Sequence, residues 1–258
     1  MGLQRMDKWF TIEKIDNKTF SISEYRHWEN VHSYLLLGKE KALLIDTGLG
    51  VSNIKNEIDK ITTLPIIVAT THVHWDHIGG HKYFDNIAVH KLEKNRLIKF
   101  LLPLAVVKDS LLKENCNFPK NFDIDNYEIY SKNPNIILND NDIIDLGNRK
   151  IKAIHTPGHS PGHLCFYDIE NKYLFTGDLI YCGKLDAYYP TTNPIDFKNS
   201  IGKIRKLDIN KILPAHYKLS INTNIVDKIW NAFVNLEREG NLKHGNGIYE
   251  YDNFSIYI

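Results

Sequence analysis

The sequence has few cysteines, no long apolar run and almost no net charge. Only three of its 258 residues are cysteine, and Cys116, Cys165 and Cys182 show no paired spacing. They are therefore expected to be reduced thiols, as in a cytoplasmic protein, rather than a disulfide framework. The residues from Met1 to Phe10 are charged and lack the apolar stretch of a secretion signal, so no such signal is predicted.

No apolar stretch is long enough to span a bilayer. The longest candidate, Leu97 to Val107, is too short and is interrupted by Lys99. The 32 basic side chains nearly balance the 31 acidic ones, so no overall field attracts nucleic acid or an anionic membrane. A local basic patch between Lys91 and Lys99 is expected to be the solvated face of a helix. A small molecule is thus the expected partner, with no nucleic acid and no membrane.

The apolar pattern predicts alternating strands and helices, and the second half of the chain repeats the kind of pattern seen in the first. The expected strands are 33–37, 42–45, 65–71, 86–91, 143–146, 150–155, 163–167, 173–176 and 210–213. The expected helices are 54–61, 194–207, the second capped by Asn193, and 225–239, and the last expected element is a hairpin at 247–258. No linker is visible, so residues 1–258 are predicted to form a single domain.

A helical segment at about 92–114 is unusually apolar and is predicted to be an insertion into this domain. Pro103 is expected to kink or split it. Its apolar side chains are expected to be buried in some way. They would belong to the ordinary core, form a homodimer contact, or form a lid over a substrate cleft that sets substrate preference.

Three histidines and an aspartate occupy the run 72–77, which reads His-Val-His-Trp-Asp-His. It follows an apolar, β-branched strand pattern, so it begins where a strand ends. Residues two apart on extended backbone point the same way, so His72 and His74 can converge on one point. The turn that follows carries Asp76 and His77 to a neighbouring point. A solvated loop rarely has this composition, whereas imidazole and carboxylate groups are the ligands of catalytic zinc, iron or manganese sites.

Three later segments also place ligand-type side chains at the end of a strand pattern. They are His155, His159 and His163 in one glycine/proline loop, then Asp178 and His216 after two further strand patterns. Alone, each of these would be interpreted as a turn residue. Together with the first cluster they supply seven histidines and two aspartates. Five histidines and two aspartates are enough for two adjacent metal ions with one shared carboxylate.

This pattern resembles the metallo-β-lactamase superfamily. The His-x-His-x-Asp-His signature is intact at 72–77, and later blocks match in order from about Ser33 to His216. The resemblance implies an α+β four-layer αββα sandwich built from two similar halves, with the site along one edge of the paired sheets. The signature is highly specific for the fold and only weakly specific for the substrate.

The resemblance also implies a role for each side chain. The seven implied metal ligands are His72, His74 and His159 for one ion, Asp76, His77 and His216 for the other, and Asp178 as the bridge between them. His159 takes the ligand position because it directly follows the first Pro-Gly. His155 and His163 are then expected to orient the ligands or to be structural. Asp46, in Ile-Asp-Thr-Gly, resembles a buried aspartate that supports the ligand loop. The histidines with no place in the pattern, which are expected to be ordinary polar residues, are His27, His32, His81, His90 and His244.

The implied chemistry follows from charge. Two divalent cations about 3.5–4 Å apart lower the pKa of a bridging water towards neutrality and orient it for attack on a carbonyl carbon. Asp76 would both bind metal and take the proton of that water. Tyr181, three residues after Asp178, resembles an active-site tyrosine of the acyl-homoserine lactonases, so its hydroxyl would donate to the substrate carbonyl. The alternative is that Tyr181 packs at a strand-to-loop corner.

Two residues indicate which branches of the family the chain does not resemble. Asp178 argues against a true β-lactamase, because those enzymes lack the bridging carboxylate, and His74 argues against the di-iron flavoproteins, which would carry an acid there. The expected function is dinuclear hydrolysis of a small carbonyl ester, thioester or lactone, with zinc first and iron or manganese as alternatives. The basic residues that bind glutathione in glyoxalase II are not recognisable after His216. Three alternative functions stay open: a mononuclear-iron oxidoreductase of the persulfide dioxygenase type, a phosphodiester hydrolase and a non-catalytic metal-binding protein.

Overall fold

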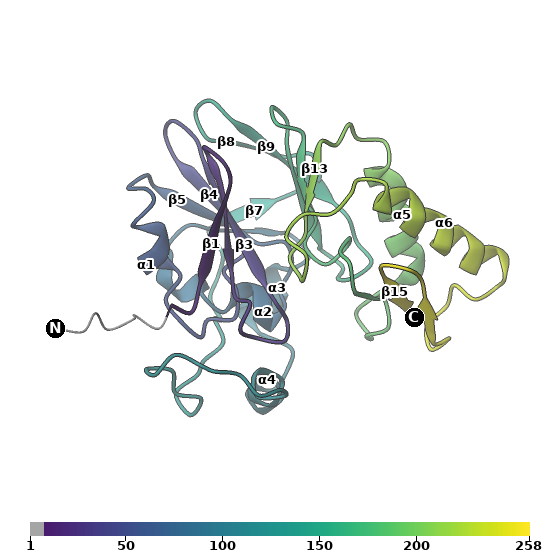
Figure 1. Ribbon diagram of the computed structural model, residues 1–258, viewed down its shortest axis with the longest axis horizontal. Coiled ribbons are helices and arrows are strands. Elements are labelled where there is room, and N and C mark those ends of the chain that lie inside the picture. The colour runs from purple at the N-terminus through teal and green to yellow at the C-terminus, as the bar shows by residue number, and fades with distance from the viewer. Residues whose placement is uncertain (1–7) are drawn as a thin grey trace.

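Two β-sheets face each other in the computed structural model, which describes residues 8–258 (Figure 1). The larger sheet has its seven strands in chain order: β1 (Thr11–Asp16), β2 (Thr19–Ser23), β3 (His32–Leu37), β4 (Ala42–Ile45), β5 (Ile66–Ala69), β6 (Ile87–His90) and β7 (Ile136–Leu138). Its first four strands are antiparallel, and β5, β6 and β7 continue from β4 in parallel.

The second half of the chain forms the other sheet. Its order is β13 (Lys211–Leu213), β11 (Tyr173–Phe175), β10 (Leu164–Asp168), β9 (Lys150–His155) and β8 (Ile143–Asp145). All of its pairs are antiparallel except β11 with β13. A small third sheet has the order β12 (Lys184–Asp186), β15 (Ser255–Tyr257) and β14 (Ile248–Glu250), so the expected hairpin at the end of the chain is confirmed.

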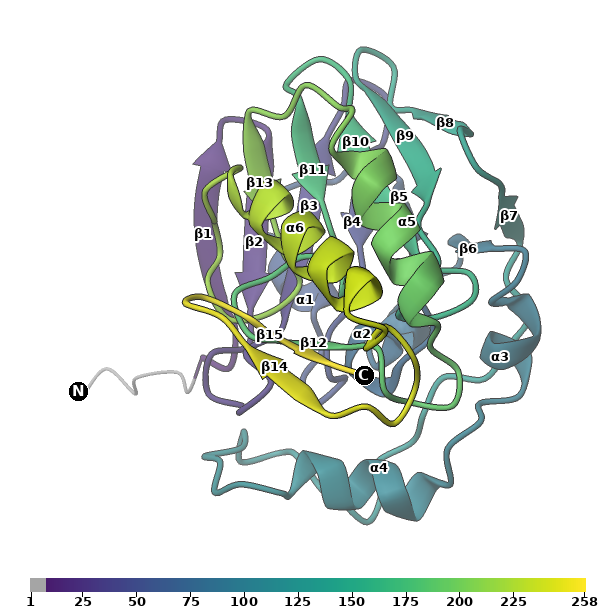
Figure 2. The ribbon, with the colours of Figure 1, turned by 90° about the vertical axis from the view of Figure 1, so that its right-hand side faces the viewer.

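Most helices lie outside the two sheets, and α4 (Leu104–Leu111) lies below the sandwich (Figures 1 and 2). The other helices are α1 (Lys55–Ile58), α2 (Trp75–Ile78), α3 (Lys94–Ile98), α5 (Pro194–Ile204) and α6 (Ile225–Arg238), with a short 3₁₀ helix at His81–Tyr83. The predicted cap of α5 is confirmed, because the Asn193 side chain accepts hydrogen bonds from the backbone of Ile195 and Asp196. Among residues 8–258, no helix combines the length and the apolar character that crossing a bilayer needs.

Successive side chains of a strand enter different hydrophobic cores, which explains why the molecule has layers. Leu43 and Ile45 of β4 are buried between the two sheets, in the same core as Phe166 of β10. Ala42 and Leu44 point to the opposite face and are buried in the core beneath the helices. A strand buried on both faces reads as a continuous apolar run, which is how the sequence shows β4. The result is the predicted four-layer αββα sandwich.

The sequence-based prediction differs from the structure at several elements, among them α2, where only a turn was expected. Strands β1, β2, β7 and β12 were not predicted, because three of them are short or lie at a sheet edge with little apolar character. The segment 92–114 is split as predicted, with Pro103 preceding α4. Its expected burial is only partly correct: Leu97, Val107 and Leu111 are buried, whereas most of the apolar side chains between them are exposed.

Candidate metal centre

The ligand-type side chains follow four strands that end at one edge of the sandwich. Strands β9, β11 and β13 run in the same direction, because β10 is antiparallel to both β9 and β11, and β13 is parallel to β11. Strand β5 ends opposite them in the other sheet. The backbone N–H of Leu164 donates to the carbonyl of Thr71 at 2.8 Å, which joins the two sheets beside the site. Residues distant in sequence therefore meet at this edge.

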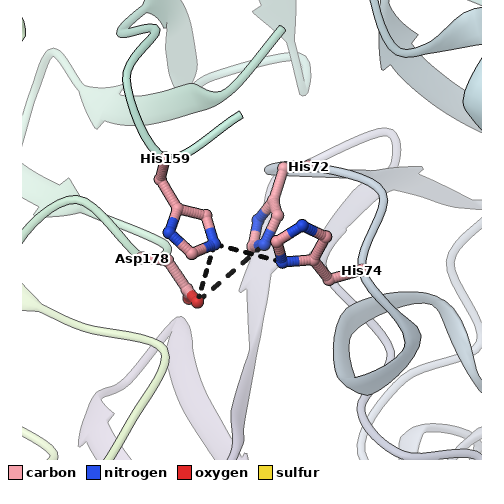
Figure 3. A group of neighbouring side chains, drawn as sticks. All are labelled: His72, His74, His159 and Asp178. Atoms are coloured by element: carbon pink, nitrogen blue, oxygen red, sulfur yellow. Dashed lines mark hydrogen bonds and ion pairs between the residues drawn. The ribbon is translucent and has the colours of Figure 1, made fainter. Parts of the chain in front are cut away.

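His72, His74, His159 and Asp178 form the first group, with one ligand atom of each residue within 4.8 Å of all the others (Figure 3). His159 Nε2 lies 3.1 Å from His74 Nδ1. Asp178 Oδ2 lies 3.3 Å from His159 Nε2 and 3.9 Å from His72 Nε2. Three imidazole nitrogens and one carboxylate oxygen thus surround a single point.

Asp76, His77 and His216 form the second group, with ligand atoms that also lie within 4.8 Å of one another. Asp76 Oδ2 is 3.3 Å from His77 Nε2 and 3.4 Å from His216 Nε2. Asp178 reaches this group as well, because its Oδ1 lies 3.2 Å from His77 Nε2 and 3.1 Å from His216 Nε2. One oxygen of Asp178 therefore faces each group, which is the arrangement of a bridging carboxylate.

Backbone carbonyls fix the orientation of two of these imidazoles. His159 Nδ1 is 3.1 Å from the carbonyl oxygen of Asp186, and His216 Nδ1 is 2.8 Å from that of Glu29. A carbonyl oxygen can only accept, so Nδ1 must carry the proton in both rings. Each Nε2 then directs its lone pair into the site, as a metal ligand requires.

Asp46 fixes the orientation of side chains in the 72–77 loop through hydrogen bonds. Its Oδ2 lies 2.9 Å from His77 Nδ1 and accepts a hydrogen bond from the Thr71 hydroxyl at 2.7 Å, while Oδ1 accepts from the Thr71 backbone N–H at 2.8 Å. The Thr71 oxygen, having donated to Asp46, can accept from His72 Nδ1 at 3.1 Å. Asp46 is buried and has a left-handed backbone with φ 56°, a conformation that aspartate tolerates better than most residues. These contacts agree with the expectation that Asp46 supports the ligand loop.

Three buried polar atoms at this point have no hydrogen-bond partner among the described residues. They are His72 Nε2, His77 Nε2 and Asp178 Oδ1; the last two lie 3.2 Å apart, but without the alignment of a hydrogen bond. Leaving one such atom unsatisfied costs about 1–3 kcal/mol, so three orphaned atoms turned towards one place need an explanation. Cations bound by these nitrogen and oxygen atoms would satisfy them. The residues therefore fit divalent metal ions of the kind that imidazole and carboxylate prefer.

The electrostatics of the site agree with that fit. Burial, reinforced by neighbouring histidines, lowers the pKa of His72 and His74 well below the usual value, so both rings are neutral. Burial lowers the pKa of His216 too, but Asp178 and Asp76 outweigh it and raise that pKa to about 10. The negative potential at the second group thus attracts either protons or a cation, and a bound metal ion would displace the protons.

Glu93 holds the loops of the first group together and was missed by the sequence analysis. Its buried carboxylate accepts from the backbone N–H of Val73 at 3.2 Å and from that of Gly162 at 2.8 Å. The first bond holds the loop of His72 and the second holds the loop after β9. Arg96 lies 3.0 Å from the same carboxylate. The sequence gives no indication of this role, because Glu93 lies in a basic stretch. Outside its own segment, its carboxylate bonds only to backbone groups.

We expect Glu93→Gln to lower metal affinity about tenfold and the free energy of unfolding by about 1–3 kcal/mol. The amide nitrogen of glutamine must face one of the two backbone N–H donors, which then has no acceptor. Metal titration followed by thermal unfolding measures both effects. The matched control is Glu128→Gln, at an exposed position. Equal affinity and stability in Glu93→Gln and in the unchanged chain would show that the carboxylate does not hold these loops.

The remaining histidines lie outside the two groups. His163 Nε2 accepts from the backbone N–H of Asp178 at 3.1 Å, so His163 positions that carboxylate. His155 belongs to neither group and stacks on His90, with ring centroids 4.1 Å apart. The other histidines without a place in the pattern are not all surface residues. His81, for example, is buried and bonds through its two ring nitrogens to the hydroxyls of Thr47 and Thr70 at 2.7 and 2.8 Å. The other buried ones are His27, His32 and His90.

Tyr181 packs beside the second group. Its ring centroid is 5.6 Å from that of His216, and its hydroxyl donates to the backbone carbonyl of Lys184. The side chain is buried, and burial with the nearby Asp178 raises its pKa well above the usual value. Because the hydroxyl already has an acceptor within its own loop, the contacts favour the packing alternative over a hydrogen bond to substrate.

We expect Tyr181→Phe to retain kcat/KM within about threefold and to lower the free energy of unfolding by about 1 kcal/mol, the usual cost of one hydrogen bond. Steady-state kinetics and thermal unfolding check the two values. Tyr181→Ala, which also removes the ring from His216, should lower both further. A tenfold loss of kcat in the phenylalanine variant at unchanged stability would instead place the hydroxyl on the substrate.

Comparison with known proteins gives similarity over most of the chain. Residues 26–216 match a family model described as the metallo-beta-lactamase superfamily. An acyl-coenzyme A thioesterase, MBLAC2 of Bos taurus, is 29% identical over 231 residues, 81% of this chain and 82% of that protein. A hydroxyacylglutathione hydrolase of Pelagibacter ubique is 29% identical over 197 residues, 72% and 66% of the two chains. A solved metallo-beta-lactamase from Pontibacter korlensis superposes with a TM-score of 0.63 at 17% identity, covering 88% of this chain and 99% of that one.

Proposed function

Because the chain belongs to the metallo-beta-lactamase superfamily, we propose that it is a dinuclear metal-dependent hydrolase that cleaves acyl thioesters. The family, its fold and a metal-dependent hydrolase were predicted from the sequence, and the family match, the solved structure and the names of the relatives confirm them at that level. The number of metal ions, their identity and the thioester are our proposal.

One observation carries the dinuclear proposal. Asp178 turns Oδ1 towards His77 and His216, and Oδ2 towards His72 and His159. A single metal ion in the first group would leave the second group of ligand atoms unused. An enzyme with one iron has no need of His77 Nε2, which is buried without a hydrogen-bond partner among the described residues.

Asp76 is the residue that we propose as the base. Two divalent ions at this site would supply Lewis acidity and a water of lowered pKa. Burial favours a neutral Asp76, but His77 and His216 outweigh it and lower its pKa to about 2, so the group is a carboxylate at neutral pH. Asp76 then accepts the proton of the attacking water as the new C–O bond forms, and passes it to the leaving group.

The leaving group favours a thioester over an amide. When the C–S bond breaks, sulfur keeps the electron pair as a thiolate, whose conjugate acid has a pKa of about 8.5. Such a group leaves without a strong acid, and Asp76 delivers the proton afterwards. Both relatives described above are named for thioester substrates. Lactones and simple esters share the carbonyl chemistry and are the next candidates.

We propose zinc as the metal, because a site of five imidazoles and two carboxylates without cysteine suits catalytic zinc, with iron and manganese as alternatives. We also propose a cytoplasmic setting, because Cys116, Cys165 and Cys182 are free thiols and cytosolic proteins keep theirs reduced.

The test combines metal quantification with a substrate panel. The purified chain is loaded with zinc, iron or manganese, and its metal content is measured beside its turnover of an acyl-coenzyme A, a hydroxyacyl-glutathione, a lactone, an aryl ester and a phosphodiester. We expect two metal ions per chain and the highest kcat/KM for a thioester. One iron per chain with oxygen consumption on a persulfide, or turnover of the phosphodiester alone, would overturn the proposal.

A further inference from the structure

Residues 98–106, which we call the apolar loop, form a nearly uninterrupted exposed hydrophobic surface. They run from the last residue of α3 to the first turn of α4, and Lys99 is their only polar residue. Leu101 is 58% exposed and Leu102 is 45% exposed, and Leu104 and Val106 are exposed to similar degrees. Single exposed apolar side chains are ordinary, but a contiguous group of this kind marks an interaction surface.

The fold holds the apolar loop outward. Leu97 before it and Val107 after it are fully buried, so both ends are fixed in the core. Ser131 donates to the carbonyl of Ile98 at 2.5 Å, and Trp28 donates to that of Ser110 at 3.0 Å. Figure 2 shows α4 below the body of the sandwich. The exposure of these leucines is therefore a feature of the folded chain.

Basic side chains surround the apolar loop. Residues 91–113 contain six basic residues and two acidic ones, a net charge of +4. Glu93 and Arg96 form a largely buried ion pair, so neither contributes much to the surface charge. Lys91, Lys94 and Lys99 form no ion pair among the described residues. The rest of the chain contains 26 basic and 29 acidic residues, a net charge of −3, so the positive charge is concentrated in the segment around the apolar loop.

From this combination we infer that the apolar loop docks the protein onto an anionic lipid bilayer. Leucines inserted at the headgroup boundary would bury apolar area, and flanking lysines would contact acidic headgroups. The segment is far too short to span a membrane, so it lies at the surface. A second copy of the chain is a poorer occupant, because two faces that each carry +4 would repel. The balanced charge of the whole chain predicted no membrane partner, but a bilayer responds to the local charge near its surface.

The docking surface lies beside the metal centre. His27 Nε2 is 3.1 Å from the carbonyl oxygen of Leu111 at the end of α4, and its ring centroid is 6.0 Å from that of Trp75. Trp75 is the first residue of α2, which also carries Asp76 and His77. Figures 1 and 2 place α4 and α2 at the same edge of the sandwich. A docked molecule would therefore hold its metal centre close to the lipid surface.

Vesicle co-sedimentation of the full chain tests the inference without any need for catalysis. The probes are phosphatidylcholine vesicles and vesicles in which phosphatidylserine replaces about a third of the lipid. We expect binding to the anionic vesicles to be at least about tenfold tighter, and to weaken as salt is added. Equal binding to both kinds of vesicle, or to neither, would overturn the inference, whether or not the chain hydrolyses thioesters.

Two double variants separate the apolar and the basic contributions. Leu101→Ser with Leu102→Ser should lower vesicle binding at least tenfold without loss of stability, because both side chains are exposed. Lys94→Glu with Lys99→Glu should abolish the preference for anionic vesicles. Ile143→Ser with Ile169→Ser is the matched control, since both isoleucines are exposed outside the segment 91–113. Concentration-dependent dimers that the leucine variant abolishes, with vesicle binding unchanged, would assign this face to a second copy instead.

Discussion

Replacing Asp178 by alanine is expected to lower kcat/KM for a thioester about 10³-fold and to remove most of the bound metal. Within residues 8–258, Asp178 is the carboxylate that reaches both groups of ligand atoms, with one oxygen 3.1–3.2 Å from His216 and His77 and the other 3.3 Å from His159. Loss of the shared carboxylate weakens both metal sites at once. Metal ions contribute several kcal/mol to such a transition state, and about 4 kcal/mol corresponds to this loss of rate.

The fold of this variant should survive. Asp178 lies in the loop after β11 and belongs to none of the three hydrophobic cores. Circular dichroism and thermal unfolding check the fold, and elemental analysis gives the metal content. Asp252→Ala, at an exposed position, is the control for loss of a carboxylate as such. Two metal ions per chain and normal turnover in Asp178→Ala would exclude a bridging role for this carboxylate.

The sequence predicted the parts of the molecule that depend on local pattern. Strands β3, β4 and β5 appear where the apolar runs end at polar turns, and His72 and His74 point together because they are two residues apart on extended backbone. His159, Asp178 and His216 are different, since no local rule brings them near the 72–77 loop. They were assigned through resemblance to a family, and the sheet topology explains their convergence because the strands before them end at one edge.

The features that the sequence missed depend on backbone contacts or on exposure. Glu29 and Asp186 orient ligand imidazoles through their own backbone carbonyls, which any residue type provides. Glu93 acts through its carboxylate, but the donors to that carboxylate are backbone N–H groups of distant loops, so no sequence pattern marks the pairing. The apolar loop was expected to be buried because apolar residues at helical spacing usually are. Whether such a segment packs inward or faces outward depends on the length of the surrounding chain and the space beneath it, and neither can be read from hydrophobicity.

Replacing Asp46 by asparagine should lower metal affinity of the second group about 100-fold, although the two side chains have the same shape. Asp46 accepts three hydrogen bonds, one at Oδ1 from the Thr71 backbone and two at Oδ2 from the Thr71 hydroxyl and His77 Nδ1. Asparagine has one accepting oxygen and one donating nitrogen. If its nitrogen replaces Oδ1, it meets the Thr71 N–H, and two donors face each other in a buried site.

If the amide nitrogen of the asparagine replaces Oδ2 instead, the consequence reaches the metal ligand itself. His77 must then accept at Nδ1 and carry its proton on Nε2, the atom that faces Asp76 and Asp178. A protonated Nε2 has no lone pair for a metal ion. Asparagine tolerates the left-handed backbone at this position as well as aspartate does, so the backbone is not strained and the effect isolates the acceptor chemistry. Competitive metal titration gives the affinity of each group, with Asp85→Asn at an exposed position as the control. A second metal ion held as tightly by Asp46→Asn as by the unchanged chain would mean that the His77 tautomer is set by the metal and not by Asp46.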